Sequence, residues 1–302
     1  MAGSRFDLRH VSFHGKPDPG PRQVARVPPA SHGEPSSKGV VAAAAPTTAQ
    51  GFAGWLLGAA GLNPLLYRNG SLDRRVSAAF RALNVRSAAD AQDLLRRRPE
   101  LLAVAVGAVL IGVTDFFRDV QVFQDMRNMV IPELARRPEP LRIWSAGCSS
   151  GSELYSVLML MDEAGLVARC AAVGTDCRAD AITDARAATY NATEMREVPA
   201  AVRDKYFEEV DGRWRVIEHL RRRTAWKIAD LCAGPEEGPW DAILWRNMGI
   251  YLSPNGGEHI LSELVRVLAP EGFLVLGKAE RPSTRIGVGL VPVCRCIYRK
   301  RA

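Results

Sequence analysis

The sequence has no apolar run long enough to cross a bilayer. The longest run, residues 101–113, has 13 residues, whereas a transmembrane helix needs about 20. We therefore expect a buried helix in this region and no membrane insertion. The first ten residues, MAGSRFDLRH, have no apolar stretch after their charges, so we also expect no secretory signal.

The sequence also lacks the cysteine and histidine patterns of metal sites and disulfide frameworks. Its six cysteines are scattered, with no CxxC pair and no histidine at a metal-ligand spacing. This pattern is typical of reduced thiols, and we expect a cytoplasmic protein without a bound metal. The formal net charge of +7 suits an acidic partner. Because no Lys/Arg block alternates with aromatic residues, we expect no nucleic-acid binding.

The chain does contain a clear change of pattern along its length. Residues 1–48 are rich in Pro, Gly, Ser and Ala without apolar periodicity, so we expect a flexible tail. Residues 49–137 have the apolar spacing of helices and predict an all-helical domain. Its helices are expected at 72–83 after Ser71 as N-cap, at 88–97 after Ser87 as N-cap, from Pro99 through the apolar run, and at 120–137.

From residue 138 to 302, short apolar strands alternate with helices. Strands are predicted at 141–146, 171–176, 240–245 and 272–277, helices at 153–164, 179–188 and 259–268, and one or two edge strands within 288–300. This alternation predicts an α/β fold with βαβ units on a mostly parallel sheet. Residues 190–227 interrupt it. We expect a small insertion there, in which residues 214–217 pair with residues 224–228.

The first predicted strand runs into a glycine turn, Gly147-Cys-Ser-Ser-Gly151, that opens a helix. Such a turn lets backbone N–H groups approach a ligand at the helix N-terminus. Its spacing is neither GxGxxG nor that of a phosphate loop. Asp176 ends the second strand, where a carboxylate accepts ribose hydroxyls. Together these features indicate an adenosine-type ligand without a pyrophosphate, such as S-adenosylmethionine; the alternative is an ordinary glycine turn and a helix-capping aspartate.

Longer stretches of the chain resemble the chemotaxis receptor methyltransferase (CheR) family. The similar blocks are GVTDFFRD (112–119), IWSAGCSSGSELYS (143–156), GTDCRADAITDARAATY (174–190), WDAILWRNMGIYL (240–252) and LVRVLAPEGFLVLGKAE (264–280). GLNPLLYRNGSLDRRV (61–76) is similar to the family's N-terminal helices. The blocks stand in family order and at family spacing. The resemblance implies an N-terminal all-helical domain joined to a doubly wound, Rossmann-like methyltransferase sheet with a small β-insertion.

The resemblance also implies a set of site residues. The implied cofactor contacts are Thr114 and Arg118 for the methionine carboxylate, Ala146 and Gly147 for the close backbone approach, Glu153 for the amino group, Asp176 for the ribose, Asp230 and Leu231 for the adenine, and Asn247 and Met248 at the end of the third strand. Arg118 and Tyr251 flank the transferable methyl group and are the implied catalytic residues. Taken alone, each has an ordinary alternative: an interdomain ion pair for Arg118, a core position for Tyr251, and the helix dipole for Glu153.

In the family the methyl acceptor is a glutamate side chain. The resemblance therefore implies a carboxyl O-methyltransferase that uses S-adenosyl-L-methionine, leaves S-adenosyl-L-homocysteine, and acts as a monomer on an acidic helical region of a chemoreceptor-like protein. A glutamate carboxylate has a pKa of about 4.3 and is ionised at neutral pH, so the transfer needs no strong base. None of the similar blocks contains a histidine, which agrees with this chemistry.

The chain departs from the family pattern at several positions. Gly112 stands where many members have Asn, Ser152 replaces one carboxylate of the family's GEEPY, and Ser77-Ala78-Ala79 stands where several members have Arg. The last departure lowers the positive charge of the helix that, in the family, faces a receptor. Two alternatives therefore stay open: a methyltransferase that acts on a small molecule, and a cofactor-binding regulatory module with little turnover.

Overall fold

The computed structural model describes residues 49–302 except 111, 113, 139, 284–286 and 288. The predicted flexible tail, residues 1–48, lies outside the described residues. Within the apolar run at 101–113, the first residue ends a single turn, η2 (Pro99–Leu101), and the following residues form a short helix, α5 (Leu102–Val109). Across the described part of the chain, every helix is too short or too polar to span a bilayer.

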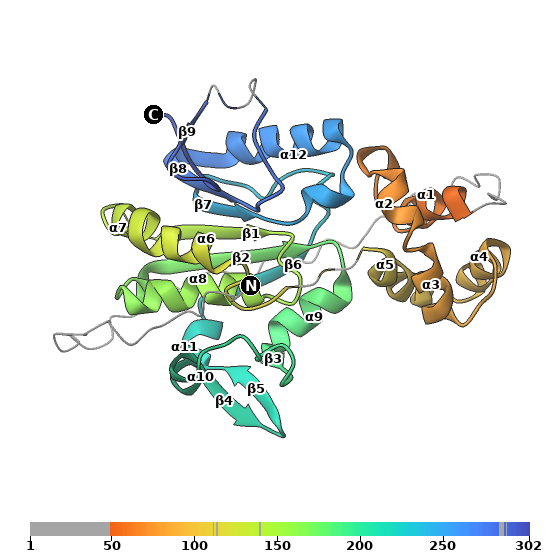
Figure 1. Cartoon of the computed structure of the whole chain (residues 1–302), viewed down its shortest axis with the longest axis horizontal. Coiled ribbons are helices and arrows are strands. Elements are labelled where there is room, and N and C mark those ends of the chain that lie inside the picture. Colours follow the sequence, from red (N-terminus) through yellow and green to blue (C-terminus); the bar gives the residue numbers. More distant parts are fainter. Residues whose placement is uncertain (1–48, 111, 113, 139, 284–286, 288) are drawn as a thin grey trace, which may run out of the picture. The chain divides into compact units, whose positions relative to one another are not determined.

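The first described part of the chain is helical, as predicted. It consists of α1 (Ala49–Ala59), η1 (Pro64–Leu66), α2 (Asn69–Asp73), α3 (Val76–Leu83), α4 (Ala88–Arg97), η2 and α5 (Figure 1). Ser87 is the N-cap of α4, and its hydroxyl oxygen accepts the Asp90 N–H at 3.1 Å.

The prediction of one continuous helix at 72–83 is wrong. The chain breaks at Arg74 and Arg75 into α2 and α3, and Ser71 lies inside α2 instead of at an N-cap. Leu72 and Val76 are both 1% exposed on either side of this break, so both segments keep their apolar residues in the core.

The helix predicted at 120–137 is present with an irregular middle. It consists of α6 (Val120–Asp125), a π-helical turn η3 (Met126–Val130) and α7 (Ile131–Leu134). Pro132 lacks a backbone N–H and cannot continue a regular α-helical ladder. The N–H of Ile131 instead reaches back to the carbonyl of Met126, as in a π-turn.

The main sheet has seven strands in the order β6-β2-β1-β7-β8-β10-β9. Five neighbouring strands are parallel: β1 (Leu141–Ala146), β2 (Cys170–Asp176), β6 (Thr224–Ile228), β7 (Trp240–Trp245) and β8 (Leu268–Leu276). The strand β10 (Ile297–Lys300) pairs antiparallel with both β8 and β9 (Leu290–Pro292). The helices α8 (Ser152–Glu163), α9 (Ala179–Ala187) and α12 (Pro254–Val267) connect and cover the parallel strands (Figure 1). The predicted α/β class is therefore confirmed. The strand order reverses between β1 and β7, where open α/β sheets bind their ligands.

The strand pairing predicted for the insertion is wrong. Residues 224–228 form β6, which pairs in parallel with β2 at the edge of the main sheet. The partners of β5 (Arg213–Val216) are instead β4 (Phe207–Val210) and β3 (Thr189–Tyr190), in a separate antiparallel sheet. Two short helices, α10 (Ala200–Tyr206) and α11 (Glu218–Arg221), flank β4 and β5 in the sequence.

The packing of Trp226 explains why β6 joins the main sheet. Its ring lies against Gly174 of β2, where an added Cβ would come within 2.3 Å of the ring, and 5.4 Å from the Tyr155 ring centroid of α8. Trp226 is only 8% exposed in this position. The segment outside the main sheet is therefore shorter than the predicted 190–227.

One hydrophobic cluster connects the N-terminal helices with the sheet. It contains Phe52 and Leu56 of α1, Trp144 of β1, Trp240 of β7 and Leu264 of α12, among other buried residues. The ring centroids of Trp144 and Trp240 lie 5.7 Å apart on neighbouring parallel strands. The helices that precede the sheet therefore share a core with it.

Two leucines of the helical part test the contribution of this core. Leu56 is 0% exposed and Leu65 is 85% exposed. Leu56→Ala should lower the free energy of unfolding by about 2–5 kcal/mol because it leaves a cavity. Leu65→Ala should change it by less than about 0.5 kcal/mol. Urea denaturation measures both, and equal losses would contradict the buried position of Leu56.

Candidate functional site

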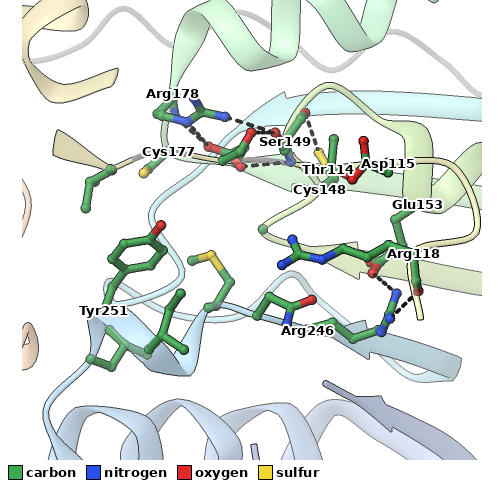
Figure 2. Close-up of a pocket in the computed structure, with 18 of the residues that line it drawn as sticks. Thr114, Asp115, Arg118, Cys148, Ser149, Glu153, Cys177, Arg178, Arg246 and Tyr251 are labelled. Atoms are coloured by element: carbon green, nitrogen blue, oxygen red, sulfur yellow. Dashed lines mark hydrogen bonds and ion pairs between the residues drawn. The ribbon is translucent and has the colours of Figure 1, made fainter. Parts of the chain in front are cut away.

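A pocket with about 1050 Å³ of empty volume lies at the carboxyl ends of β1, β2 and β7 (Figure 2). Residues that follow these strands line it together with the linker after α5 and parts of the N-terminal helices. The predicted site residues that line the pocket are Thr114, Arg118, Gly147, Glu153, Asp176, Asn247, Met248 and Tyr251.

Three predicted cofactor contacts are not among the residues that line the pocket. Ala146 is 1% exposed at the end of β1 and belongs to the hydrophobic cluster. Asp230 and Leu231 follow β6, and the Asp230 carboxylate accepts the N–H of Cys232 at 2.9 Å. The assignment of Asp230 and Leu231 to the adenine, and of Ala146 to the close backbone approach, stays a prediction.

The glycine turn after β1 has the backbone that the sequence predicts. Gly147 and Gly151 have φ values of +79° and +88°, a region that glycine adopts without strain. A Cβ on Gly147 would lie 2.8 Å from the Met248 side chain, so this turn and the end of β7 approach each other closely. The N–H groups of Gly147 and Cys148 both donate to the Thr175 carbonyl at 2.8 Å, which holds the turn beside the end of β2.

Asp176 connects the end of β2 to the glycine turn. One carboxylate oxygen accepts the Ser149 N–H at 2.9 Å, and the other accepts the Arg178 N–H at 3.0 Å. The residue is 7% exposed. Two backbone donors orient this carboxylate at the pocket wall and stabilise its charge there.

Arg246 is the centre of a buried ion network that the sequence interpretation missed. Its side chain is 1% exposed and forms ion pairs with Glu153 at 3.0 Å and Asp119 at 3.1 Å. It also donates to the carbonyl of Arg118 at 2.6 Å. Ser145 donates its hydroxyl to the other Glu153 oxygen at 2.8 Å. The network therefore fixes Glu153 and the backbone of Arg118 relative to β1 and β7.

Asp119 belongs to the same network and has a perturbed pKa. Burial alone would raise the pKa of this carboxyl, but the hydrogen bond to Lys278 and the charges of Arg246 and Lys278 hold it below its usual value. A carboxyl with a lowered pKa in the folded state stabilises the fold above its unfolded pKa. That contribution is lost as the pH falls through the folded value.

Arg118 and Tyr251 project into the pocket from different sides (Figure 2). Tyr251 ends the single turn η5 (Gly249–Tyr251), and its carbonyl accepts the Arg68 N–H at 2.8 Å. Arg75 lies over the Tyr251 ring, with 5.3 Å between its guanidinium carbon and the ring centroid. Its Nη1 atom is buried and has no hydrogen-bond partner among the described residues. Arg75 thus brings a second cation to the Tyr251 side of the pocket.

The described side chains of the pocket do not form a metal centre. Among the described residues, no three His, Cys, Asp or Glu side chains are grouped closely enough to hold a metal ion. Burial raises the pKa of the Cys148 thiol well above its usual value, so this pocket residue is not a thiolate at neutral pH.

Removal of the Arg246 side chain should have a large effect on the stability of the fold. Arg246→Ala should lower the free energy of unfolding by about 3–5 kcal/mol, because it leaves the Glu153 and Asp119 carboxylates without their buried cation. Arg266→Ala, which removes an exposed pair with Glu263, should cost less than about 1 kcal/mol. Urea denaturation compares the two, and similar small losses would contradict a buried network.

Comparisons with known proteins agree on one family. The family model described as the CheR methyltransferase, SAM binding domain, matches residues 112–286. The chain is 33% identical over 205 residues to the chemotaxis protein methyltransferase of Vibrio parahaemolyticus serotype O3:K6, covering 64% of this chain and 74% of that protein. It is 34% identical over 200 residues to chemotaxis protein methyltransferase 1 of Pseudomonas aeruginosa, covering 63% and 73%. It is 25% identical over 241 residues to the chemotaxis protein methyltransferase of Listeria monocytogenes, covering 80% and 92%.

The residues of the pocket fit S-adenosylmethionine by the chemistry of their donors and acceptors. The cofactor carries sugar hydroxyls and an ammonium group, for which the carboxylates of Asp176 and Glu153 are suitable acceptors. It also carries a carboxylate, for which the guanidinium of Arg118 is a suitable donor. The matched domain includes all three residues. The chain belongs to the CheR methyltransferase family and is an S-adenosylmethionine-dependent methyltransferase.

Proposed function

We propose that this enzyme methylates the carboxylate of glutamate side chains in a chemoreceptor-like signalling protein. The observation that carries the proposal is the pair of cations, Arg75 and Arg118, that lines the pocket with Tyr251. None of the described residues that line the pocket is a histidine or a lysine. Two guanidinium groups and a phenol suit an anionic acceptor that is already deprotonated. The similarity of the chain to chemotaxis protein methyltransferases supports an acceptor that belongs to a chemotaxis-like signalling system.

The chemistry requires alignment more than proton transfer. The bound cofactor supplies a methyl group on a positively charged sulfur. One carboxylate oxygen of the acceptor forms the new bond to the methyl carbon as the carbon–sulfur bond breaks, and the electron pair of that bond returns to sulfur. The products are a methyl ester and S-adenosylhomocysteine, and both opposite charges disappear in the step. Correct positioning of reacting groups can lower such a barrier by about 7–11 kcal/mol.

We assign the alignment to Arg118 and Tyr251. The carbonyl of Arg118 is held by Arg246, and the turn that ends in Tyr251 is held by the backbone of Arg68. Both catalytic side chains therefore extend from backbone that is fixed by hydrogen bonds. Each can donate to the acceptor carboxylate without taking a proton from it, and the five N–H donors of the Arg118 guanidinium allow it to serve the cofactor carboxylate as well. Asp176 is assigned to the cofactor sugar and Glu153 to its amino group.

The identity of the acceptor can be tested by following a labelled methyl group. The full chain is incubated with methyl-labelled S-adenosylmethionine and membranes from the source cells, and the products are separated by size. We expect label on a membrane-protein band and its release as methanol in mild alkali, as a glutamyl methyl ester requires. Alkali-stable label, or label in the low-mass fraction, would contradict the proposal and favour a different acceptor. Absence of label despite cofactor binding by calorimetry would favour a regulatory module.

Substitution of Tyr251 and of Asp176 should separate catalysis from binding. Tyr251→Phe removes one hydroxyl donor and should slow methyl transfer at saturating cofactor by roughly 10-fold or more, with little change in cofactor Kd. Asp176→Ala removes a buried acceptor and should weaken cofactor binding by roughly 10- to 100-fold. Calorimetry gives the Kd and single-turnover transfer gives the rate. Equal losses of binding in both variants would show that Tyr251 is wrongly assigned.

A further inference from the structure

Arg178 joins three separate segments at the pocket wall. Its guanidinium donates to the Ser149 hydroxyl at 3.1 Å, and Ser149 in turn donates that hydroxyl to the Gly112 carbonyl at 2.9 Å. The same guanidinium forms an ion pair with Asp176 at 3.4 Å. The Arg178 side chain is 11% exposed, and all four residues line the pocket. Figure 2 shows the guanidinium beside Ser149 at this wall.

The absence of a side chain at residue 112 makes room for this guanidinium. A Cβ on Gly112 would lie 2.4 Å from the Arg178 Nη2 atom and 2.7 Å from the Ser149 hydroxyl oxygen. Cβ atoms in real structures essentially never come closer than 3.0 Å to such neighbours. Residues 112 and 178 are therefore a coupled pair: the arginine occupies the space that any other residue at 112 would need.

The three segments carry different parts of the site. Gly112 begins the linker that carries Thr114 and Arg118, Ser149 lies in the glycine turn, and Asp176 ends β2. Holding them in one arrangement before the ligand arrives lowers the entropy cost of binding. A guanidinium is suited to this task because its planar set of donors reaches several acceptors at once, which an ammonium group does not.

We infer that Arg178 is a positioning residue for S-adenosylmethionine, which holds the linker, the glycine turn and the Asp176 carboxylate in their binding arrangement. Gly112 supports the same arrangement, because a Cβ there would push the end of the arginine side chain out of this position. The inference rests on the proposed assignment of Asp176 to the cofactor sugar. It does not depend on which molecule accepts the methyl group.

A double-mutant cycle on the full chain tests the inference through binding alone. Calorimetry gives the Kd for S-adenosylmethionine and for S-adenosylhomocysteine without an acceptor, and urea denaturation confirms that each variant is folded. Arg178→Ala and Gly112→Ala should each weaken binding of both ligands by roughly 10-fold, a change of about 1.4 kcal/mol. The double variant should lose less affinity than the sum of the two single losses, because Gly112→Ala acts mainly by displacing the arginine and otherwise only presses on the Ser149 hydroxyl.

Two further variants separate positioning from a general effect of charge or folding. Arg178→Lys keeps the charge but not the planar donors, and should recover only part of the lost affinity. Arg186→Ala, in the helix α9 that directly follows Arg178 but outside the pocket lining, should leave both Kd values unchanged. Additive losses in the double variant, or an unchanged Kd for Arg178→Ala, would overturn the inference. Because no acceptor is present, failure of the receptor-labelling experiment leaves this result interpretable.

Discussion

The hydrogen bond between the Asp176 carboxylate and the Ser149 N–H is the interaction on which the site depends. It joins the end of β2 to the glycine turn that follows β1, next to the point between β1 and β7 where the strand order of the sheet reverses. The carboxylate is buried and would be costly without such donors, and the turn needs the positive φ values of its glycines to present them. The strand order, the geometry of the glycine turn and the buried acidic residue together place one acceptor, the Asp176 carboxylate, at the pocket wall.

A second constraint lies deeper, where Arg246 joins Glu153, Asp119 and the backbone of Arg118. Buried ion pairs contribute little net stability compared with apolar residues of the same volume, because the charges must leave water. The position of the network indicates a different benefit: it fixes groups from α8, the linker and the end of β7 at the wall of the pocket. Arg75 and the backbone of Arg68 hold Tyr251 in place from the side of the N-terminal helices. The proposed catalytic residues therefore lie on segments that other parts of the chain hold in place.

Much of the fold could be predicted from the sequence because its signals are local. The alternation of apolar strands with helices gave the parallel strands, and the glycine turn and Asp176 pointed to the correct edge of the sheet. The placement of β6 could not be predicted in this way. It depends on the contact of Trp226 with Gly174, about 50 residues apart in the chain and visible only in three dimensions. Arg246 gave a usable signal that was missed, since a charged residue directly follows the buried strand β7 at the ligand-binding edge. The contact between Arg178 and Gly112 had no signal in the sequence, because these residues are far apart in the chain and meet only in the folded structure.

The position of the demethylated cofactor in the pocket is the property that tests this site most directly. A crystal structure of the full chain with S-adenosylhomocysteine tests it. We expect the sugar hydroxyls within hydrogen-bond distance of the Asp176 carboxylate, and the sulfur atom turned toward Arg118 and Tyr251. A ligand bound elsewhere, or a pocket that stays closed by its own side chains at saturating ligand, would contradict the site described above.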